Sequence, residues 1–162
     1  MSIRSLGSLL CSGIALLLVM LPSVVAAAPA TGTCRPVQVK FIASSLDHST
    51  TSFSFVGIPE TLIAFTQGGA AASCVLVRFS ASTYGANAID VVNVRALVDN
   101  VVSHPAVISV RGESDTVGFP RSFEFIFPSV APGNHTVRMQ FSSDKGNLVH
   151  VKNHNMVVQY TP

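Results

Sequence analysis

Apolar and polar residues alternate with a period of two over most of the chain that follows Pro36. The segment RSFEFIF, residues 121–127, shows this most clearly, because phenylalanine occupies three alternate positions. Successive side chains of a β-strand point to opposite faces of its sheet, so the alternation predicts half-buried antiparallel strands. The same pattern occurs in VQVKFI (37–42), SFSFV (52–56), VLVRFSAS (75–82), DVVNVRALV (90–98) and NHTVRMQF (134–141).

The alternation also predicts which side chains face the core. Val37, Val39 and Phe41 share one face of the first segment, and Phe53 and Phe55 share one face of the second. We expect these apolar faces to be buried, because large apolar side chains gain most from removal from water.

Weaker strand patterns near residues 62–65, 106–110, 148–151 and 156–160 bring the expected total to eight to ten strands. Turn-forming residues separate the segments, and no capped segment of helical period is present after residue 30. So many short strands indicate two packed sheets. We therefore expect residues 28–162 to form a single all-β domain, an antiparallel β-sandwich of immunoglobulin-like or jelly-roll topology.

The segment SFEFIFPSVAPGNHTVRMQFSS, residues 122–143, adds a family resemblance. It resembles the E strand, E–F corner and F strand of immunoglobulin-like and fibronectin-type-III-like sandwiches. Val130, Pro132 and Gly133 match the apolar-x-Pro-Gly turn of that corner, while His135 stands where the corner tyrosine would be. The resemblance implies a sandwich and implies no activity.

Residues 1–27 have the pattern of a secretory signal peptide. Arg4 supplies the early cation, residues 14–21 are uninterrupted apolar, and small residues lead to a cut near Ala27 or Ala28. The apolar stretch is shorter than the roughly 20 residues that span a bilayer, so we expect cleavage and no retained anchor. The sequence therefore predicts a secreted or periplasmic protein.

The charge balance excludes strong attraction to nucleic acid. The chain has 10 Lys and Arg against 8 Asp and Glu, and the cations lie singly along the sequence. Binding a phosphate backbone needs several cations on one surface. No apolar stretch after the leader is long enough to cross a membrane. We expect an unknown protein or surface ligand as partner, with no nucleic acid and no membrane span.

The cysteines become an even pair once the leader is removed, because Cys11 leaves with it. Cys34 and Cys74 then remain in an oxidising compartment, and we predict a disulfide between them. It would close a loop of about 40 residues and contribute ~4 kcal/mol by the chain-entropy model. Their spacing lacks the close pairs of a metal or redox site.

The histidines near the C-terminus are candidate ligand residues. His150 and His154 are four apart and Met156 follows two later, so one continuous strand would place all three on the same face. Imidazole nitrogen and thioether sulfur suit copper, and His135 in the preceding strand could join the set.

The alternative is that residues 152–155 form a hairpin turn, because Asn153 and Asn155 favour turns. That turn would place His154 at a tip and separate it from the other candidates. His48 and His104 read as polar groups of loops. We assign no metal and no cofactor on this evidence.

Short catalytic motifs are missing from the sequence: it has no Gly-x-Ser-x-Gly, no His-Glu-x-x-His and no phosphate-binding glycine loop. We assign no catalytic residue, and the balance favours a non-enzymatic protein. Sugar-binding sandwiches use exposed aromatic platforms, but the chain has no Trp and only 2 Tyr. Tyr84, in STYGANA, is the one loop aromatic that could contact a ligand.

These observations predict a secreted or periplasmic, non-enzymatic binding module that contacts a protein or surface ligand through its loops. The alternative is a small copper- or zinc-handling or hydrolytic exported protein that uses the region of His135, His150 and His154.

Overall fold

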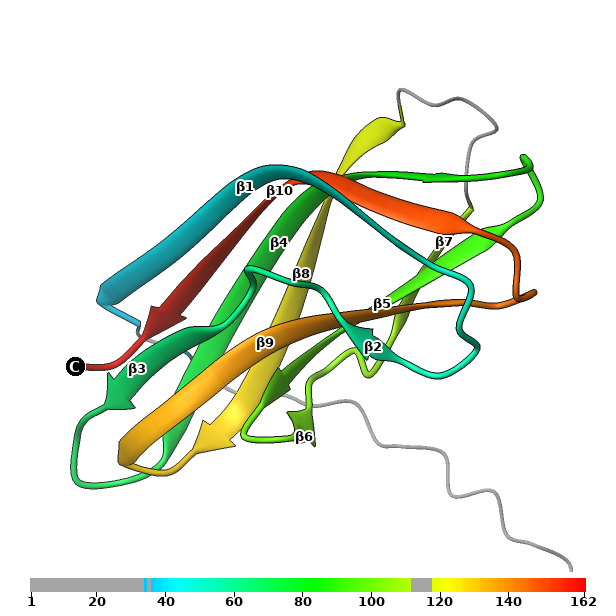
Figure 1. The fold of residues 1–162 in the computed structure, drawn as a ribbon. Helices are drawn as coiled ribbons and strands as arrows, with labels where there is room; N and C mark the ends of the chain where they lie inside the picture. Colours follow the sequence, from blue (N-terminus) through cyan, green and yellow to red (C-terminus); the bar gives the residue numbers. More distant parts are fainter. Residues whose placement is uncertain (1–33, 35, 112–117) are drawn as a thin grey trace, which may run out of the picture.

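Ten strands form two antiparallel sheets in the part of the chain that the computed structural model describes, namely residues 34, 36–111 and 118–162 (Figure 1). The predicted all-β sandwich is confirmed, and the predicted leader lies outside the described residues. The strands are β1 (Gln38–Thr50), β2 (Val56–Gly57), β3 (Ile63–Gln67), β4 (Ser73–Gly85), β5 (Val91–Val98), β6 (Val101–Val102), β7 (Ile108–Arg111), β8 (Phe119–Val130), β9 (Gly133–Ser143) and β10 (Val149–Tyr160).

The strand order is that of a jelly roll. One sheet has the order β1-β10-β4-β8; the other has β2-β9-β5-β6, with β3 also on β9 and β7 also on β5. The first strand therefore pairs with the last, and successive pairs nest inside it, as when a long hairpin folds over on itself. An immunoglobulin sandwich instead pairs its first two strands within one sheet. Of the two expected topologies, the strand order selects the jelly roll.

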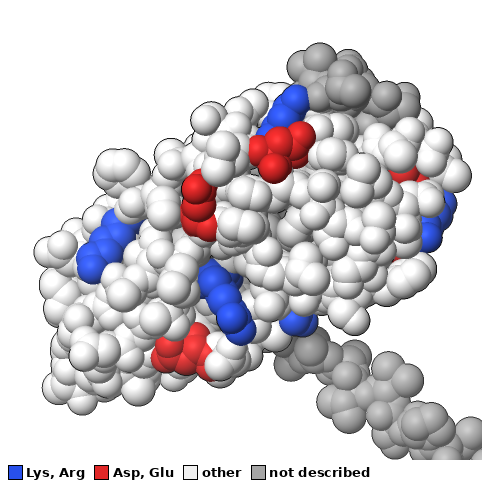
Figure 2. All heavy atoms as spheres, in the orientation of Figure 1, with Lys and Arg blue, Asp and Glu red and all other residues white. Residues whose placement is uncertain are grey.

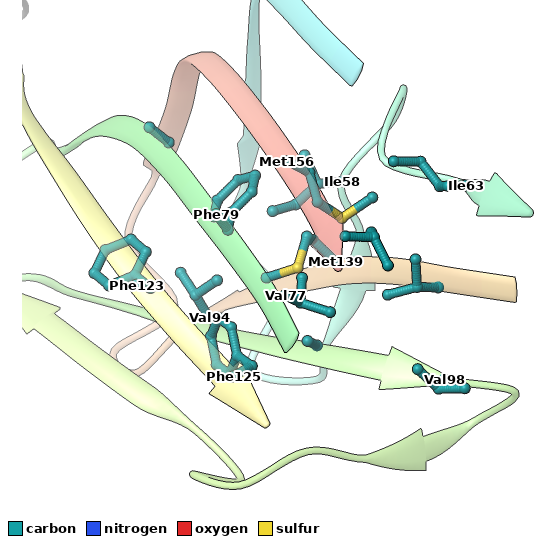
Figure 3. Close-up of a cluster of buried hydrophobic side chains, with 14 of the residues drawn as sticks. Ile58, Ile63, Val77, Phe79, Val94, Val98, Phe123, Phe125, Met139 and Met156 are labelled. Atoms are coloured by element: carbon teal, nitrogen blue, oxygen red, sulfur yellow. The ribbon is translucent and has the colours of Figure 1, made fainter. Parts of the chain in front are cut away.

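The core lies between the sheets and follows the alternation of the sequence. Val77 and Phe79 of β4 and Phe123 and Phe125 of β8 point inward from the four-stranded sheet, and Met139 of β9 meets them from the six-stranded sheet (Figure 3). Each such side chain contributes about 1.5–3 kcal/mol through its removal from water. The patterned faces of β4, β5, β8 and β9 therefore hold the two layers together.

Strand β1 does not follow the sequence prediction. Val37, Val39 and Phe41 were expected to face the core, but they point outward, and Phe41 is 77% exposed. The pairing of β1 with β10 sets this register: Phe41 lies opposite Val157, and Val39 lies opposite Gln159, which belong to the outer face. Alternation identifies two faces of a strand but not which one is inward.

The predicted strand at residues 52–56 is also wrong. Residues 51–55 connect β1 to the short β2, and Phe53 is 70% exposed. Phe55 is half-buried, and the Arg95 guanidinium lies over its ring at 4.0 Å from the centroid. Serine and phenylalanine alternate here without a partner strand that would bury the aromatic face.

The C-terminal region forms one strand, β10, rather than two strands with a hairpin between them. The register against β4 shifts between Lys152 and Asn155, and Asn153 has a φ of 48°. Asparagine tolerates this left-handed conformation better than most residues, which accounts for its place in the bulge. The bulge lets the strand continue instead of turning back.

The predicted disulfide between Cys34 and Cys74 is confirmed, with Cα atoms 5.5 Å apart. It joins the segment that precedes β1 to the start of β4. The two linked strands are not neighbours, because β10 lies between them.

Candidate functional site

Four polar side chains meet on the outer face of the four-stranded sheet, at the end where β4 finishes and β10 begins. The Tyr84 hydroxyl donates a hydrogen bond to Asp47 Oδ2 at 2.5 Å, and His150 Nδ1 lies 3.1 Å from Asp47 Oδ1. The Tyr84 and His150 rings stack with centroids 4.2 Å apart. Lys152 Nζ lies 5.0 Å from the Tyr84 ring centroid. We call Asp47, Tyr84, His150 and Lys152 the polar cluster.

This environment holds the Tyr84 phenol in its protonated form. Burial, the hydrogen bond to Asp47 and the charge of that carboxylate raise the pKa of Tyr84 from 10.0 to about 12. Tyr84 is only 9% exposed, and the His150 ring stacks on it. It is therefore an anchor within the sheet, not an open platform on which a sugar ring could stack.

The bulge in β10 separates the two histidines that were expected on one face. His150 points outward into the polar cluster, whereas His154 and Met156 point inward and are buried. One extra residue in a strand moves every later side chain to the other face. The set of His150, His154 and Met156 is therefore not assembled, although His154 and Met156 share a face.

The third predicted histidine, His135, lies at the opposite end of the sandwich. Its ring stands 5.5 Å from that of Phe65, which in turn contacts Tyr160 at the far end of β10. Tyr160 and His150 are ten residues apart on that strand, or roughly 30 Å at the rise of a β-strand. His135 and His150 cannot bind one small ligand.

The His135 ring is already engaged by protein atoms. Nδ1 lies 2.5 Å from Asp99 Oδ2, and Nε2 lies 2.8 Å from the Ala131 carbonyl oxygen. Hydrogen bonds from the Thr136 N–H and from His135 hold the pKa of Asp99 below its ordinary value. This end of the molecule carries a hollow of about 270 Å³, lined in part by Lys40, Asp99 and His135.

His154 has a second set of neighbours that the sequence did not indicate. Its ring centroid lies 5.5 Å from that of His48 in β1 and 5.9 Å from that of Phe79. Burial and the neighbouring His48 lower the pKa of His154, while the backbone and carboxylate of Glu60 oppose this more weakly. The sequence suggested that His48 lies in a loop, and Glu60 belongs to no recognisable motif. The pairing of β1 with β10 brings His48 close to His154, and the β2–β3 connection adds Glu60.

The outer face of the four-stranded sheet is apolar along its β1 side, whereas β4 and β8 carry the exposed Arg78–Glu124 ion pair on the same face. Val37, just before β1, forms a row on it with Val39 and Phe41 of β1, and half-buried Val157 of β10 lies opposite Phe41. We call these four residues the apolar row. On the face shown in Figure 2, charged side chains are scattered and neither sign forms a continuous patch.

The described part of the chain contains no helix with the length and hydrophobicity needed to cross a bilayer.

The fold and these sites define a disulfide-linked jelly-roll sandwich with a partly apolar outer face. No protein-family model and no curated protein sequence matches the chain.

Among solved structures, the chain is similar to dimeric latent PorU from Porphyromonas gingivalis, with 10% identity and a TM-score of 0.49 over 82% of this chain. The chain spans 13% of the PorU chain.

It is also similar to the CBM36-1 domain of a multidomain xylanase from the hindgut metagenome of Trinervitermes trinervoides, with 10% identity and a TM-score of 0.40. The match covers 74% of this chain and 96% of the CBM36-1 domain. A third similar structure is that of infectious bursal disease virus Gx strain, with 12% identity and a TM-score of 0.46. The match covers 83% of this chain and 37% of the viral chain. None of these likenesses carries an inference about ligand or activity.

Proposed function

We propose that the chain is an exported, non-enzymatic binding module that recognises a partner protein through the outer face and free edge of β1. The observation that carries this is the apolar row, in which Val37, Val39 and Phe41 are all exposed at alternate positions, while the patterned faces of β4, β5, β8 and β9 are buried. Single exposed apolar residues are ordinary, but a contiguous row with an exposed phenylalanine is typical of an interaction surface.

The position of β1 in its sheet supports a polypeptide as the ligand. Within the described residues β1 pairs with β10 alone, so its other edge presents unpaired backbone N–H and C=O groups. An extended segment of a partner can add to such an edge, while apolar side chains give affinity. This assignment places the contact on a strand edge instead of the loops that the sequence favoured.

The neighbours of Phe41 favour a protein over a carbohydrate. The side chains beside it on this face are the aliphatic Val39 and Val157, whereas sugar recognition combines an aromatic platform with adjacent hydrogen-bonding groups. Tyr84, the aromatic residue nearest to polar groups on the same sheet, is covered.

Site-specific crosslinking tests this proposal. A photo-reactive phenylalanine analogue at position 41 should form one discrete adduct with a partner protein in the cells that export the chain. Phe53 provides the matched control, because its exposure of 70% is close to the 77% of Phe41 and it lies outside β1. With the purified partner, Phe41→Lys should weaken binding at least tenfold, or about 1.4 kcal/mol, and Phe53→Lys should leave it unchanged.

Three outcomes would overturn the proposal. Equal adducts at positions 41 and 53 would show that the row is not selective. An adduct with the mass of two copies of this chain would show self-association. A hydrolytic activity lost in His135→Gln or His150→Gln, with folding intact, would show that the protein is an enzyme.

A further inference from the structure

Three potential metal ligands meet where β1, β10 and the β2–β3 connection come together. They are the half-buried His48 of β1, the exposed Glu60 of the connection and His154 of β10, which is 1% exposed. One ligand atom from each lies within 4.8 Å of the other two. Small side-chain movements, chiefly of the exposed Glu60, would place all three ligand atoms 2.0–2.2 Å from a central zinc ion, the distances typical of zinc–nitrogen and zinc–oxygen bonds.

The histidine nitrogens at this point lack ordinary partners. Buried His154 faces the backbone of Glu60, but neither of its ring nitrogens makes a hydrogen bond of good geometry with the described part of the chain, and the same holds for His48 Nε2. Buried polar atoms are nearly always paired, because an unpaired one loses about 1–3 kcal/mol of hydration. Three such nitrogens on two adjacent histidines indicate a site built for something other than internal hydrogen bonds.

The backbone is irregular beside both histidines and at Glu60 itself. The β1–β10 register shifts between Ser44 and Asp47, and the facing strand carries the bulge at Asn153. Glu60 has a φ of 56°, in the left-handed region. Irregular backbone in neighbouring strands is commonly found where side chains are redirected toward a site.

The connection that carries Glu60 is held in place by the next residue. The Thr61 hydroxyl donates to the Ile58 carbonyl oxygen at 2.6 Å and accepts from the Met139 N–H at 3.1 Å. Both contacts are buried, and they fix the turn against β9 of the other sheet. Glu60 is thus presented from a rigid base toward the two histidines.

We infer that His48, Glu60 and His154 bind a divalent transition-metal ion, with Zn²⁺ as the best match. Two imidazoles and one carboxylate are donors that zinc accepts, whereas Ca²⁺ and Mg²⁺ prefer oxygen ligands alone. Three protein ligands leave a fourth position for water. The ion would connect β1 and β10 of the four-stranded sheet to a turn that is held on β9 of the six-stranded sheet. It would therefore link the two sheets and stabilise the fold. This inference is independent of the proposed partner surface.

Metal binding to the exported full chain, purified without a histidine tag, tests the site. Zn²⁺ should bind at one equivalent, and a hundredfold excess over its dissociation constant should raise Tm by roughly 5–10 °C. Co²⁺ should bind at the same stoichiometry and give the visible absorption of a tetrahedral site. His48→Gln and Glu60→Gln should each weaken zinc binding by about tenfold or more.

His150→Gln and His135→Gln are the matched controls, since each removes an imidazole elsewhere on the surface. Both should bind Zn²⁺ as the unchanged chain does. His154→Gln replaces a buried ring, so its folding is checked first by its unfolding curve; the His48 and Glu60 variants decide the question without it. Absence of one-equivalent binding at 100-fold molar excess of metal, or an equal loss in either control, would overturn the inference.

Discussion

At the scale of single residues, Asp47 determines how the polar cluster behaves. Its two carboxylate oxygens accept from Tyr84 and contact His150, and the stacked rings fix both partners. A tyrosine that donates to a carboxylate resists ionisation, because the phenolate would face a second negative charge. The raised pKa of Tyr84 follows from burial first and from Asp47 second.

We predict that Tyr84 titrates near pH 12 and that Asp47→Asn lowers its pKa toward 10. Because the folded value lies above the unfolded one, Tyr84 stabilises the fold fully below pH 10 and loses this contribution as pH rises toward 12. Ultraviolet titration in a Tyr160→Phe background isolates the signal of Tyr84. Titration near pH 10 in both Tyr160→Phe proteins, with and without Asp47→Asn, would refute the assigned environment.

The sequence identified the histidines as notable residues but could not assign their neighbours. His150 and His154 are close in sequence, yet one extra residue between them sends their side chains to opposite faces. His48 looked like a loop residue and lies beside His154. Contacts between strands that are distant in sequence determine the neighbours, and a local pattern does not carry that information.

At the scale of elements, β1 and β10 depart most from the sequence prediction. The β1–β10 pairing shifts register between Ser44 and Asp47, and the β10–β4 pairing shifts between Lys152 and Asn155, at the same level of the sheet. The predicted inward face of β1 became the apolar row for this reason: β10 fixes its register, and alternation is symmetric between the two faces. The inner faces of β4, β5, β8 and β9 matched the prediction, because in these strands the patterned apolar face is the one that packs between the two sheets.

The bulge in β10 should depend on the conformational tolerance of Asn153. We predict that Asn153→Val destabilises the protein by about 1–2 kcal/mol, since a β-branched residue opposes a φ of 48°. Asn153→Gly should be close to neutral, because glycine adopts this conformation freely. Urea unfolding measures both.

Asn155→Val serves as the control for that series, because Asn155 is exposed on the same strand without a positive φ. Its stability should stay within about 0.5 kcal/mol of the unchanged chain. If Asn153→Val cost no more than Asn155→Val, the bulge would not depend on the left-handed residue.

At the scale of the whole molecule, the nested pairing makes the chain ends partners. β1 and β10 lie side by side although they are the first and last strands of the described residues, so this pairing joins segments about a hundred residues apart. The disulfide connects the segment before β1 to β4, on the other side of β10. It stabilises the fold by reducing the conformational freedom of the unfolded chain between residues 34 and 74.

We predict that replacing both Cys34 and Cys74 by alanine lowers the free energy of unfolding by about 2–4 kcal/mol, because the unfolded chain gains the entropy of an open loop. Urea unfolding should also show a larger m-value, since the unfolded state becomes less compact. Mass analysis without reductant gives the direct check on the unchanged chain. Two free thiols there, or equal stability of the double variant, would contradict the linkage.

The sequence by itself determined the all-β class, the inner faces of β4, β5, β8 and β9, and the pairing of the two cysteines remaining after the predicted leader. These follow from local alternation and from counting, which need no knowledge of neighbours. Tertiary structure decided the choice of jelly roll over immunoglobulin topology, the outward face of β1, and the meeting of His48, Glu60 and His154. Each of these depends on which distant strands pair and in what register, and that is set by the packing of both sheets together.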